Sequence, residues 1–274
     1  MRLQVDGRGV FVYTGGRRFD PAAPTVAFVH GTPHDHSVWG LQTRWLAHHG
    51  WSVLAFDLPG HGRSDGPPLS SIEAIGEWLP RAIAAAGASR AVIVGHSMGS
   101  LAALEAAGRA PSAVAGVALV GVAFPMRVSD TLMNAARDDE AAAFDMANRW
   151  SYARLAHPPG APAPGCSAYV AALRLMERQP RGTMLNDLAA CNAWTGGLER
   201  ARALHCPALF VLGERDQMAP PRQASALIDA IPGARVVEVR GCSHAIPVEG
   251  ADELRDALAD WLRGPAFGSP NPGG

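Results

Sequence analysis

The chain has 274 residues, of which 48% are hydrophobic, and carries a formal net charge of −1 at pH 7. A chain of this length and composition can bury a large core and form one or two domains. The balanced charge offers no basic surface of the kind that binds nucleic acid or an anionic membrane, so we expect neither partner.

The cysteines and the N-terminus indicate the cellular setting. Cys166, Cys191, Cys206 and Cys242 are scattered, without a C-x-x-C pair or metal-ligand spacing, and are expected to be reduced thiols. The first residues lack the apolar segment and cleavage site of a signal peptide, and no apolar run reaches the length of a membrane span. We therefore expect a cytoplasmic enzyme.

Short apolar runs predict the strands of one sheet. A hairpin begins near Leu3, and its second arm covers residues 10–13. Further strands are predicted over residues 25–29, 52–56, 91–94, 114–122, 207–212 and 235–239. Helical patterns separate them, over residues 38–48, 71–86, 98–109, 221–231 and 249–263. Continuous apolar strands alternating with helices indicate an α/β protein with a mostly parallel central sheet covered on both faces.

One segment breaks this alternation. Residues 125–203 contain no strand candidate, only helical stretches over 129–153, 168–178 and 183–194, with a Pro-rich break at 156–165. Long insertions of this kind in compact domains are usually functional. We predict a core formed by residues 1–124 and 204–263, a helical cap formed by 125–203, and a disordered Pro/Gly-rich tail over 264–274.

The segment Gly95-His96-Ser97-Met98-Gly99 is a G-x-S-x-G sequence between a predicted strand and a predicted helix. Such a turn holds its serine in a strained conformation with Oγ exposed, and the flanking glycines let the strand and the helix approach each other. A Gly-rich turn that happens to contain a serine is the alternative, and the strand-turn-helix context disfavours it. Ser97 is therefore a candidate nucleophile.

A serine nucleophile needs a general base, and the base needs an acid that orients it. Asp216 follows the predicted strand 207–212 and His244 follows 235–239. Both side chains should therefore reach the edge of the sheet at which Ser97 lies, where open α/β sheets bind their ligands. The chain order Ser97, Asp216, His244 is typical of this arrangement. Glu214 competes with Asp216 for the role of the acid.

Acyl transfer also needs donors for the developing oxyanion. The backbone N–H of Met98, at the start of the predicted helix, is one candidate. The second should come from the loop after residues 25–29, and Pro33 in that loop has no N–H. The N–H of Thr32 is the remaining candidate.

These motifs together resemble those of the α/β-hydrolase superfamily, in its capped bacterial branch. The matching segments are the H-G-x-P loop at 30–33, a D-x-P-G-x-G-x-S segment at 57–64, and residues 95–99, 213–216 and 241–244. The resemblance extends from about residue 3 to residue 263. It implies the α/β-hydrolase fold, a helical cap over the site, a cis proline in the H-G-x-P loop, and chemistry without a cofactor.

A substrate pocket is expected between the core and the cap. The side chains predicted to line it are His30, Phe124, Phe144, Trp150, Trp194, Met218 and Ile246. His30, His34, Asp35 and His36 resemble a metal-binding cluster at first sight. We do not expect a metal site, because His30 belongs to the oxyanion loop and no other ligand group clusters nearby.

The leading hypothesis is an esterase-type serine hydrolase that cleaves a carboxylic ester of a small, largely apolar substrate through an acyl-enzyme intermediate. Ser97 argues against the epoxide hydrolases and haloalkane dehalogenases, whose nucleophile is Asp, and Pro33 and Ala245 argue against the C–C bond hydrolases. Haloperoxidase or perhydrolase, lactonase and C–C bond chemistry remain alternatives with the same triad. A small-molecule receptor that retains the triad is the alternative of another class. The expected partner is a small-molecule substrate, and a homodimer is left open.

Overall fold

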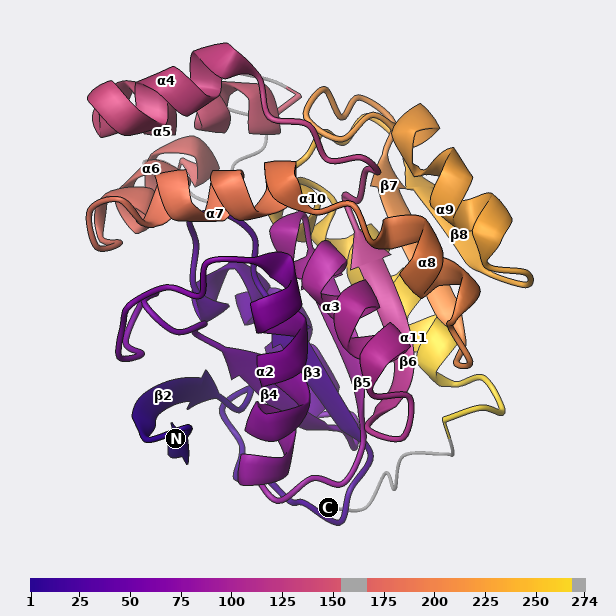
Figure 1. Ribbon diagram of the computed structural model, residues 1–274. Helices are drawn as coiled ribbons and strands as arrows, with labels where there is room; N and C mark the ends of the chain where they lie inside the picture. The colour runs from indigo at the N-terminus through magenta and orange to yellow at the C-terminus, as the bar shows by residue number, and fades with distance from the viewer. Residues whose placement is uncertain (154–166, 268–274) are drawn as a thin grey trace.

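The computed structural model describes residues 1–153 and 167–267. Its centre is an eight-stranded sheet in the order β1-β2-β4-β3-β5-β6-β7-β8, with helices on both faces (Figure 1). The pairs β1–β2 and β2–β4 are antiparallel, and all other neighbours are parallel. The predicted mostly parallel sheet flanked by helices is confirmed.

The strands follow the apolar runs of the sequence. They are β1 (Arg2–Val5), β2 (Arg8–Tyr13), β3 (Thr25–Val29), β4 (Ser52–Phe56), β5 (Ala91–His96), β6 (Val114–Val120), β7 (Ala208–Gly213) and β8 (Arg235–Val239). Every residue of β3, β4, β5 and β7 is buried. These strands lack polar alternation because helices cover both of their faces.

Two apolar layers enclose the sheet. On one face the buried side chains of α2 (Ile72–Ala85) and α3 (Met98–Arg109) form the larger cluster, joined by α9 (Ser225–Ala230). On the other face α1 (Gly40–Ala47) and α11 (Ala251–Leu262) pack against the same strands. The short helical turns are η1 (His36–Trp39), η2 (Pro221–Ala224) and α10 (Ile246–Glu249).

A helical insertion follows β6 and covers the carboxyl ends of the strands (Figure 1). It contains α4 (Asp130–Asp138), α5 (Glu140–Ser151), α6 (Ala168–Glu177) and α7 (Thr183–Ala193). The helix predicted over 129–153 is divided in two at Asp139, whose carboxylate accepts the N–H of Ala142 and caps α5.

The end of the predicted cap belongs to the core layer. The helix α8 (Gly197–Arg202), inside the range predicted for the cap, packs on α3 and α9. The Pro-rich break predicted at 156–165 and residues 268–274 of the predicted tail lie outside the described residues.

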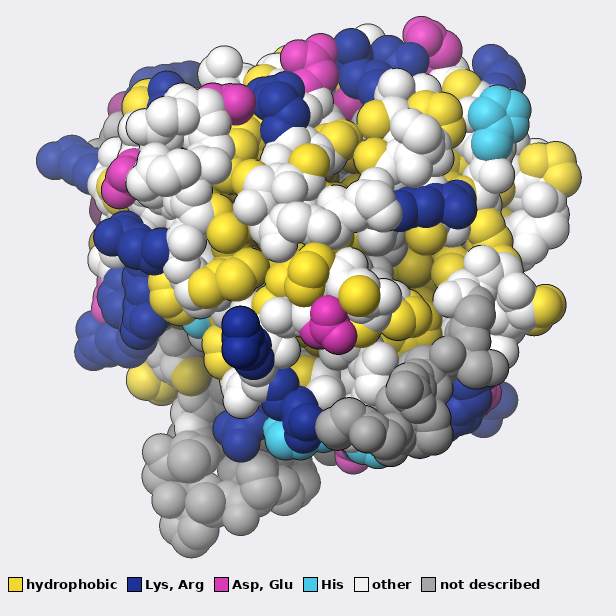
Figure 2. Space-filling model, turned by 90° about the horizontal axis from the view of Figure 1, so that it is seen from below, with side chains coloured by type: hydrophobic (Ala, Val, Ile, Leu, Met, Phe, Trp, Pro, Cys, Tyr) yellow, Lys and Arg dark blue, Asp and Glu magenta, His cyan; other side chains and the backbone are white. Residues whose placement is uncertain are grey.

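On the surface opposite the insertion, hydrophobic side chains gather towards the middle and most Arg side chains lie towards the margin, but basic and acidic side chains also lie among the hydrophobic ones (Figure 2). Within residues 1–153 and 167–267, no helix is both long and apolar enough to cross a bilayer.

Candidate active site

Ser97 lies at the junction of β5 and α3 with φ +52° and ψ −118°. A side-chain-bearing residue pays about 1–3 kcal/mol in such a sparsely populated backbone region. Hydrogen bonds hold the turn: the N–H of Ser97 donates to the Val120 carbonyl at 2.9 Å, and its own carbonyl accepts the Ser100 N–H at 2.9 Å. Ser97 lines a cavity that it shares with His244.

Close contacts between backbones require glycine on either side of Ser97. A Cβ atom on Gly95 would overlap the carbonyl oxygen of Gly99, and one on Gly99 would overlap the carbonyl oxygen of Val29. Glycine at these two positions lets the start of α3 pack directly on β3 and β5.

His244 and Asp216 meet at the carboxyl edge of the sheet. Nδ1 of His244 lies 2.7 Å from Oδ2 of Asp216, and Oδ1 of Asp216 accepts the N–H groups of Met218 and Ala219 at 2.9 and 2.8 Å. Burial alone would raise the pKa of Asp216, but His244 and these N–H groups outweigh it and lower the pKa. The ionised carboxylate accepts Nδ1–H, which favours the tautomer of the neutral imidazole in which Nε2 can take a proton.

Glu214, the competing acid, is directed elsewhere. Its side chain is exposed, and Oε2 accepts the Gly241 N–H at 2.6 Å. The geometry therefore pairs His244 with Asp216.

The buried ring of His96 supports the loop that carries His244. Its Nε2 lies 2.8 Å from the carbonyl oxygen of His244, and the two rings are 4.9 Å apart. Burial lowers the pKa of His96 to about 3, so the ring is neutral and Nε2–H donates to that carbonyl. The sequence carries no signal for this contact, because the motif places no chemical requirement on its second position.

The loop after β3 passes directly beside Ser97. A Cβ atom on Gly31 would lie 3.1 Å from Cβ of Ser97, and Oγ1 of Thr32 lies 3.5 Å from Sδ of Met98. The Met98 N–H is in the first turn of α3, where N–H groups have no acceptor within the helix. The cis peptide bonds of the described chain precede Pro67 and Pro125, so the cis proline expected at Pro33 is wrong.

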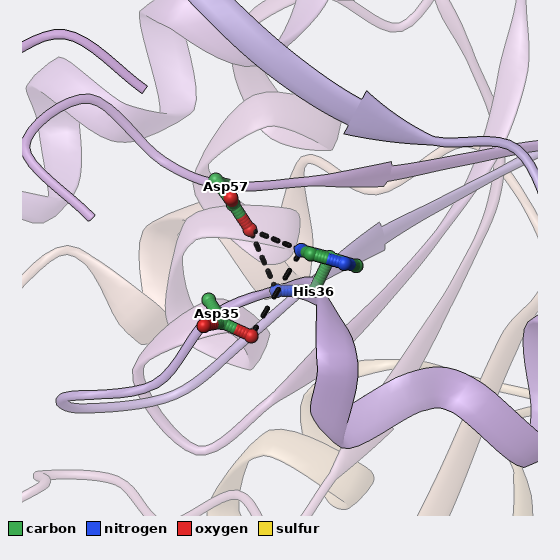
Figure 3. Close-up of side chains that lie close together, drawn as sticks. All are labelled: Asp35, His36 and Asp57. Carbon is green, nitrogen blue, oxygen red and sulfur yellow. Dashed lines mark hydrogen bonds and ion pairs between the residues drawn. The ribbon is translucent and has the colours of Figure 1, made fainter. Parts of the chain in front are cut away.

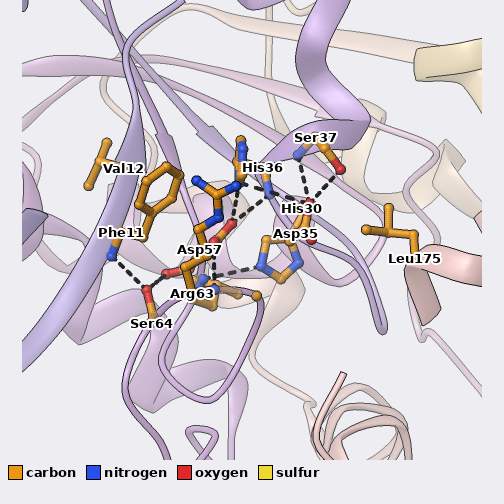
Figure 4. A network of polar contacts seen from close by, with 12 residues as sticks. Phe11, Val12, His30, Asp35, His36, Ser37, Asp57, Arg63, Ser64 and Leu175 are labelled. Atoms are coloured by element: carbon orange, nitrogen blue, oxygen red, sulfur yellow. Dashed lines mark hydrogen bonds and ion pairs between the residues drawn. The ribbon is translucent and has the colours of Figure 1, made fainter. Parts of the chain in front are cut away.

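His30 holds this loop in place and does not line the cavity, contrary to expectation. Its Nε2 accepts the Leu58 N–H at 3.2 Å, so Nδ1 carries the proton and donates to the Gly31 carbonyl at 2.9 Å. Burial lowers the pKa of His30 well below its ordinary value, and the ring is neutral. His30 thus joins the loop after β3 to the segment that follows β4 (Figure 4).

Asp35, His36 and Asp57 come together beside this loop, with ligand atoms within 4.8 Å of one another (Figure 3). By residue type the group could hold a cation, although neither His30 nor His34 belongs to it. Asp57 Oδ1 accepts the His36 N–H at 2.8 Å and lies 2.6 Å from His36 Nδ1, while Oδ2 accepts the Arg63 N–H at 2.9 Å. Because protein donors already occupy these oxygens, the group fits a structural network that ties two loops together.

Ser97 and His244 border a cavity of about 610 Å³ between the sheet and the insertion. This volume is within the range of small-molecule sites. Apolar side chains from the insertion form much of its wall, including Leu132, Leu175, Met176, Met184 and Leu188.

Two of the side chains predicted for the pocket, Trp150 and Met218, line this cavity. Five do not: His30, Phe124, Phe144, Trp194 and Ile246. Several polar side chains that were not predicted for the pocket also line it, namely His34, Asn148, Tyr152, Arg127, Arg174 and Arg178.

The apolar side chains that were wrongly predicted to line the cavity pack in the interior instead. Phe144 lies in the apolar cluster of the insertion itself. Trp194 donates its Nε1–H to buried Glu105 at 3.0 Å, and Phe124 packs edge-on against Trp194 with ring centroids 5.7 Å apart. Ile246 is fully buried against the layer of α11. An apolar residue on a helix can face a neighbour or a cavity, and its periodicity is the same in both cases.

A buried ion pair joins the insertion to the core. Nε2 of His61 lies 2.9 Å from Oδ2 of Asp187 on α7, and Nδ1 lies 3.1 Å from the Pro59 carbonyl. Both neighbours are acceptors, so both ring nitrogens carry protons. Burial, the largest single influence, opposes this charge, but Asp187 and the other acceptors outweigh it and raise the pKa of His61.

Two further hydrogen bonds reinforce this junction. The Gly62 N–H donates to Oε1 of Gln179 at 2.8 Å, and Nδ2 of Asn186 donates to the Leu69 carbonyl at 2.8 Å. The α6–α7 end of the insertion is therefore fixed to the loop after β4.

Comparisons with known proteins agree with this architecture. The model of the alpha/beta hydrolase fold family matches residues 24–251. A protein of Klebsiella pneumoniae subsp. pneumoniae named as a proposed carbamate hydrolase, RutD, is 29% identical over 256 residues, which cover 88% of this chain and 92% of the relative.

An ester hydrolase and a lactonase are also similar. The pimeloyl-acyl-carrier-protein methyl ester esterase of Neisseria meningitidis serogroup C is 28% identical over 244 residues, covering 78% of this chain and 84% of that protein. The crystal structure of the enol-lactonase from Burkholderia xenovorans LB400 superimposes with a TM-score of 0.83 at 25% identity, over 96% of this chain and 100% of that one.

The ion pair predicts a pH-dependent stability. Removing one partner of a buried pair costs about 3–5 kcal/mol, so we expect His61→Gln to lower the free energy of unfolding by roughly that amount. Because the folded pKa of His61 is raised, its contribution is complete below the unfolded value of about 6.5 and is lost as pH rises through the folded pKa. In urea titrations the difference from wild type should be larger at pH 5.5 than at pH 9, whereas the exposed control His205→Gln should show no difference. An equal loss at both pH values would contradict a charged His61.

The cavity wall predicts which aromatic residue affects selectivity. Trp150→Ala should change the relative rates across a panel of esters, lactones and carbamates of increasing size more than the rate on the smallest of them, because Trp150 lines the cavity. Phe144→Ala should instead lower stability by about 3–5 kcal/mol, as expected for a buried Phe, and leave the ranking of the panel unchanged. Specificity constants for this panel, with unfolding curves for both variants, test this. Selectivity that follows Phe144 would show that the lining is wrongly assigned.

Proposed function

The chain belongs to the alpha/beta hydrolase fold family, and we propose that within it the protein is a serine hydrolase that cleaves a carboxylic ester of a small, largely apolar molecule. The observation that carries the proposal is the 2.7 Å contact between His244 Nδ1 and Asp216 Oδ2, in the loops that meet at the cavity of Ser97. A base held by a buried acid, at a cavity that it shares with a serine on a strained turn, is an arrangement that can activate the serine hydroxyl.

In the proposed first step, Oγ of Ser97 attacks the ester carbonyl while its proton moves to Nε2 of His244. Asp216 stabilises the imidazolium that forms. The carbonyl oxygen becomes negative and accepts hydrogen bonds from the N–H groups of Thr32 and Met98. His244 then gives its proton to the leaving alcohol, which departs and leaves an acyl group on Ser97.

Water completes the cycle. His244 takes a proton from water, the resulting hydroxide attacks the acyl carbon, and the same two N–H groups stabilise the second oxyanion. The proton on His244 returns to Oγ as the acid is released. Each step uses groups of this chain and water alone.

The bond that is cleaved belongs to a group of related acyl bonds. The relatives are named for carbamate, ester and lactone substrates, and all three contain a carbonyl that the same serine chemistry can attack. The apolar wall of the cavity supports an ester with a largely apolar acyl group. A lactone is the second candidate, favoured by the likeness to the enol-lactonase over the whole length of that chain.

The proposal predicts the identity of the nucleophile. Ser97→Ala should lower kcat by about 10⁴–10⁶, a reduction typical of replacing the serine of a catalytic triad, and should leave the unfolding curve unchanged. A serine-directed fluorophosphonate should label the wild type at Ser97 only, as located by peptide mass spectrometry. Sustained turnover of a short-chain ester distinguishes the enzyme from a receptor, which would release product in one burst. Labelling that persists in Ser97→Ala would refute the assignment.

Replacing Asp216 and replacing Glu214 should have different effects on kcat. Asp216→Asn should lower kcat by about 10⁴, because the amide favours the tautomer of His244 that cannot accept the serine proton. The matched variant Glu214→Gln should stay close to the wild-type rate, because Glu214 contacts Gly241 rather than His244. Steady-state kinetics on one ester compare the two. A larger loss in Glu214→Gln would assign the acid to Glu214.

A further inference from the structure

The cavity wall carries arginines that the proposed reaction does not use. Arg127, Arg174 and Arg178 line it together with Ser97 and His244. The described lining residues include no Asp or Glu. The wall is therefore apolar with a positive charge, rather than uniformly apolar.

These arginines come from two parts of the insertion. Arg127 lies between β6 and α4; it is exposed, and its guanidinium makes no hydrogen bond or ion pair with another described residue. Arg174 is on α6 and Arg178 caps the end of this helix. Four residues apart, their side chains leave the same side of the helix, where two like charges repel each other.

The ion pairs of α6 leave donors available. Arg178 lies 2.8 Å from Oδ2 of buried Asp35, so its charge is matched within the protein. Arg174 lies 2.6 Å from Glu177, but 72% of its side chain is exposed, and such surface pairs contribute little to stability. Arg127 and Arg174 are thus the two arginines of the wall that a ligand can engage at little cost.

The remaining titratable groups of the wall add no negative charge. His34 lines the cavity with Nδ1 buried and without a hydrogen-bond partner, and burial lowers its pKa to about 4. His96 is neutral as well, as described above. In the proposed reaction His244 gains a positive charge in this environment, so an anion bound in the cavity would favour the charged base.

We propose that the substrate carries a carboxylate remote from the scissile ester, with an apolar segment between the two. The carboxylate binds at Arg127 and Arg174, whose planar guanidinium groups match its geometry, and the apolar segment lies along the wall formed by Leu132, Leu175 and Leu188. This inference rests on the proposed function and adds a substrate class to it.

The test compares monoethyl esters of linear dicarboxylic acids of six to ten carbons with twins in which the free carboxylate is a carboxamide. We expect wild type to prefer at least one carboxylate ester over its twin by about tenfold in kcat/KM, as one charge-assisted hydrogen-bonded contact provides. The Arg127→Gln/Arg174→Gln double variant should lose this preference, because its kcat/KM should fall more on the carboxylate ester than on the carboxamide. Raising the salt concentration should reduce the wild-type preference.

A matched double variant controls for net charge. Arg137→Gln/Arg181→Gln removes two positive charges from residues that do not line the cavity, and should retain the preference. Equal hydrolysis of both ester types by wild type, or an unchanged preference in Arg127→Gln/Arg174→Gln, would overturn the inference while Ser97-dependent turnover preserved the proposed function. Absence of turnover on every ester, together with no phosphonate labelling of Ser97, would refute the proposed function itself.

Discussion

The close packing of α3 on β3 and β5 is the constraint on which the site depends. Glycine at 95 and 99 is what lets the backbones approach, and Ser97 takes up the strained conformation between them. The same packing brings the first turn of α3 beside the loop after β3. The position of the candidate nucleophile and that of the candidate oxyanion donors are therefore set by one contact.

Histidines around this contact differ in protonation because their neighbours differ. Burial lowers the pKa of His30, His34 and His96, which keeps them neutral. His61 is as deeply buried, yet the carboxylate of Asp187 and a backbone carbonyl raise its pKa. The neutral rings of His30 and His96 thus brace the loops of the core, whereas the charged ring of His61 secures the insertion to them.

The insertion is fixed to the core at both ends: at the end of α5, the Ser151 carbonyl accepts the Ala245 N–H at 2.8 Å. Its α6–α7 end is held by the polar contacts of His61, Gly62 and Leu69, while its other side chains supply the apolar and cationic lining of the cavity. These contacts hold the insertion over the cavity that Ser97 lines. The chemistry resides in the core, and we infer that selectivity resides in the insertion.

The sequence by itself determined the sheet, the strand-turn-helix at Ser97 and the order of the loops that carry Asp216 and His244. Strands buried on both faces leave continuous apolar runs in the sequence, and the turn at Ser97 tolerates only glycine at its two flanks. The strands and this turn can therefore be predicted without a structure. Which apolar side chains of the insertion reach the cavity was decided by helix packing, because Phe144 and Trp194 have the same local pattern as Trp150. The pairing of His61 with Asp187, 126 residues apart, likewise arises only when α7 packs on the loop after β4, since neither residue has a local signal that identifies its partner.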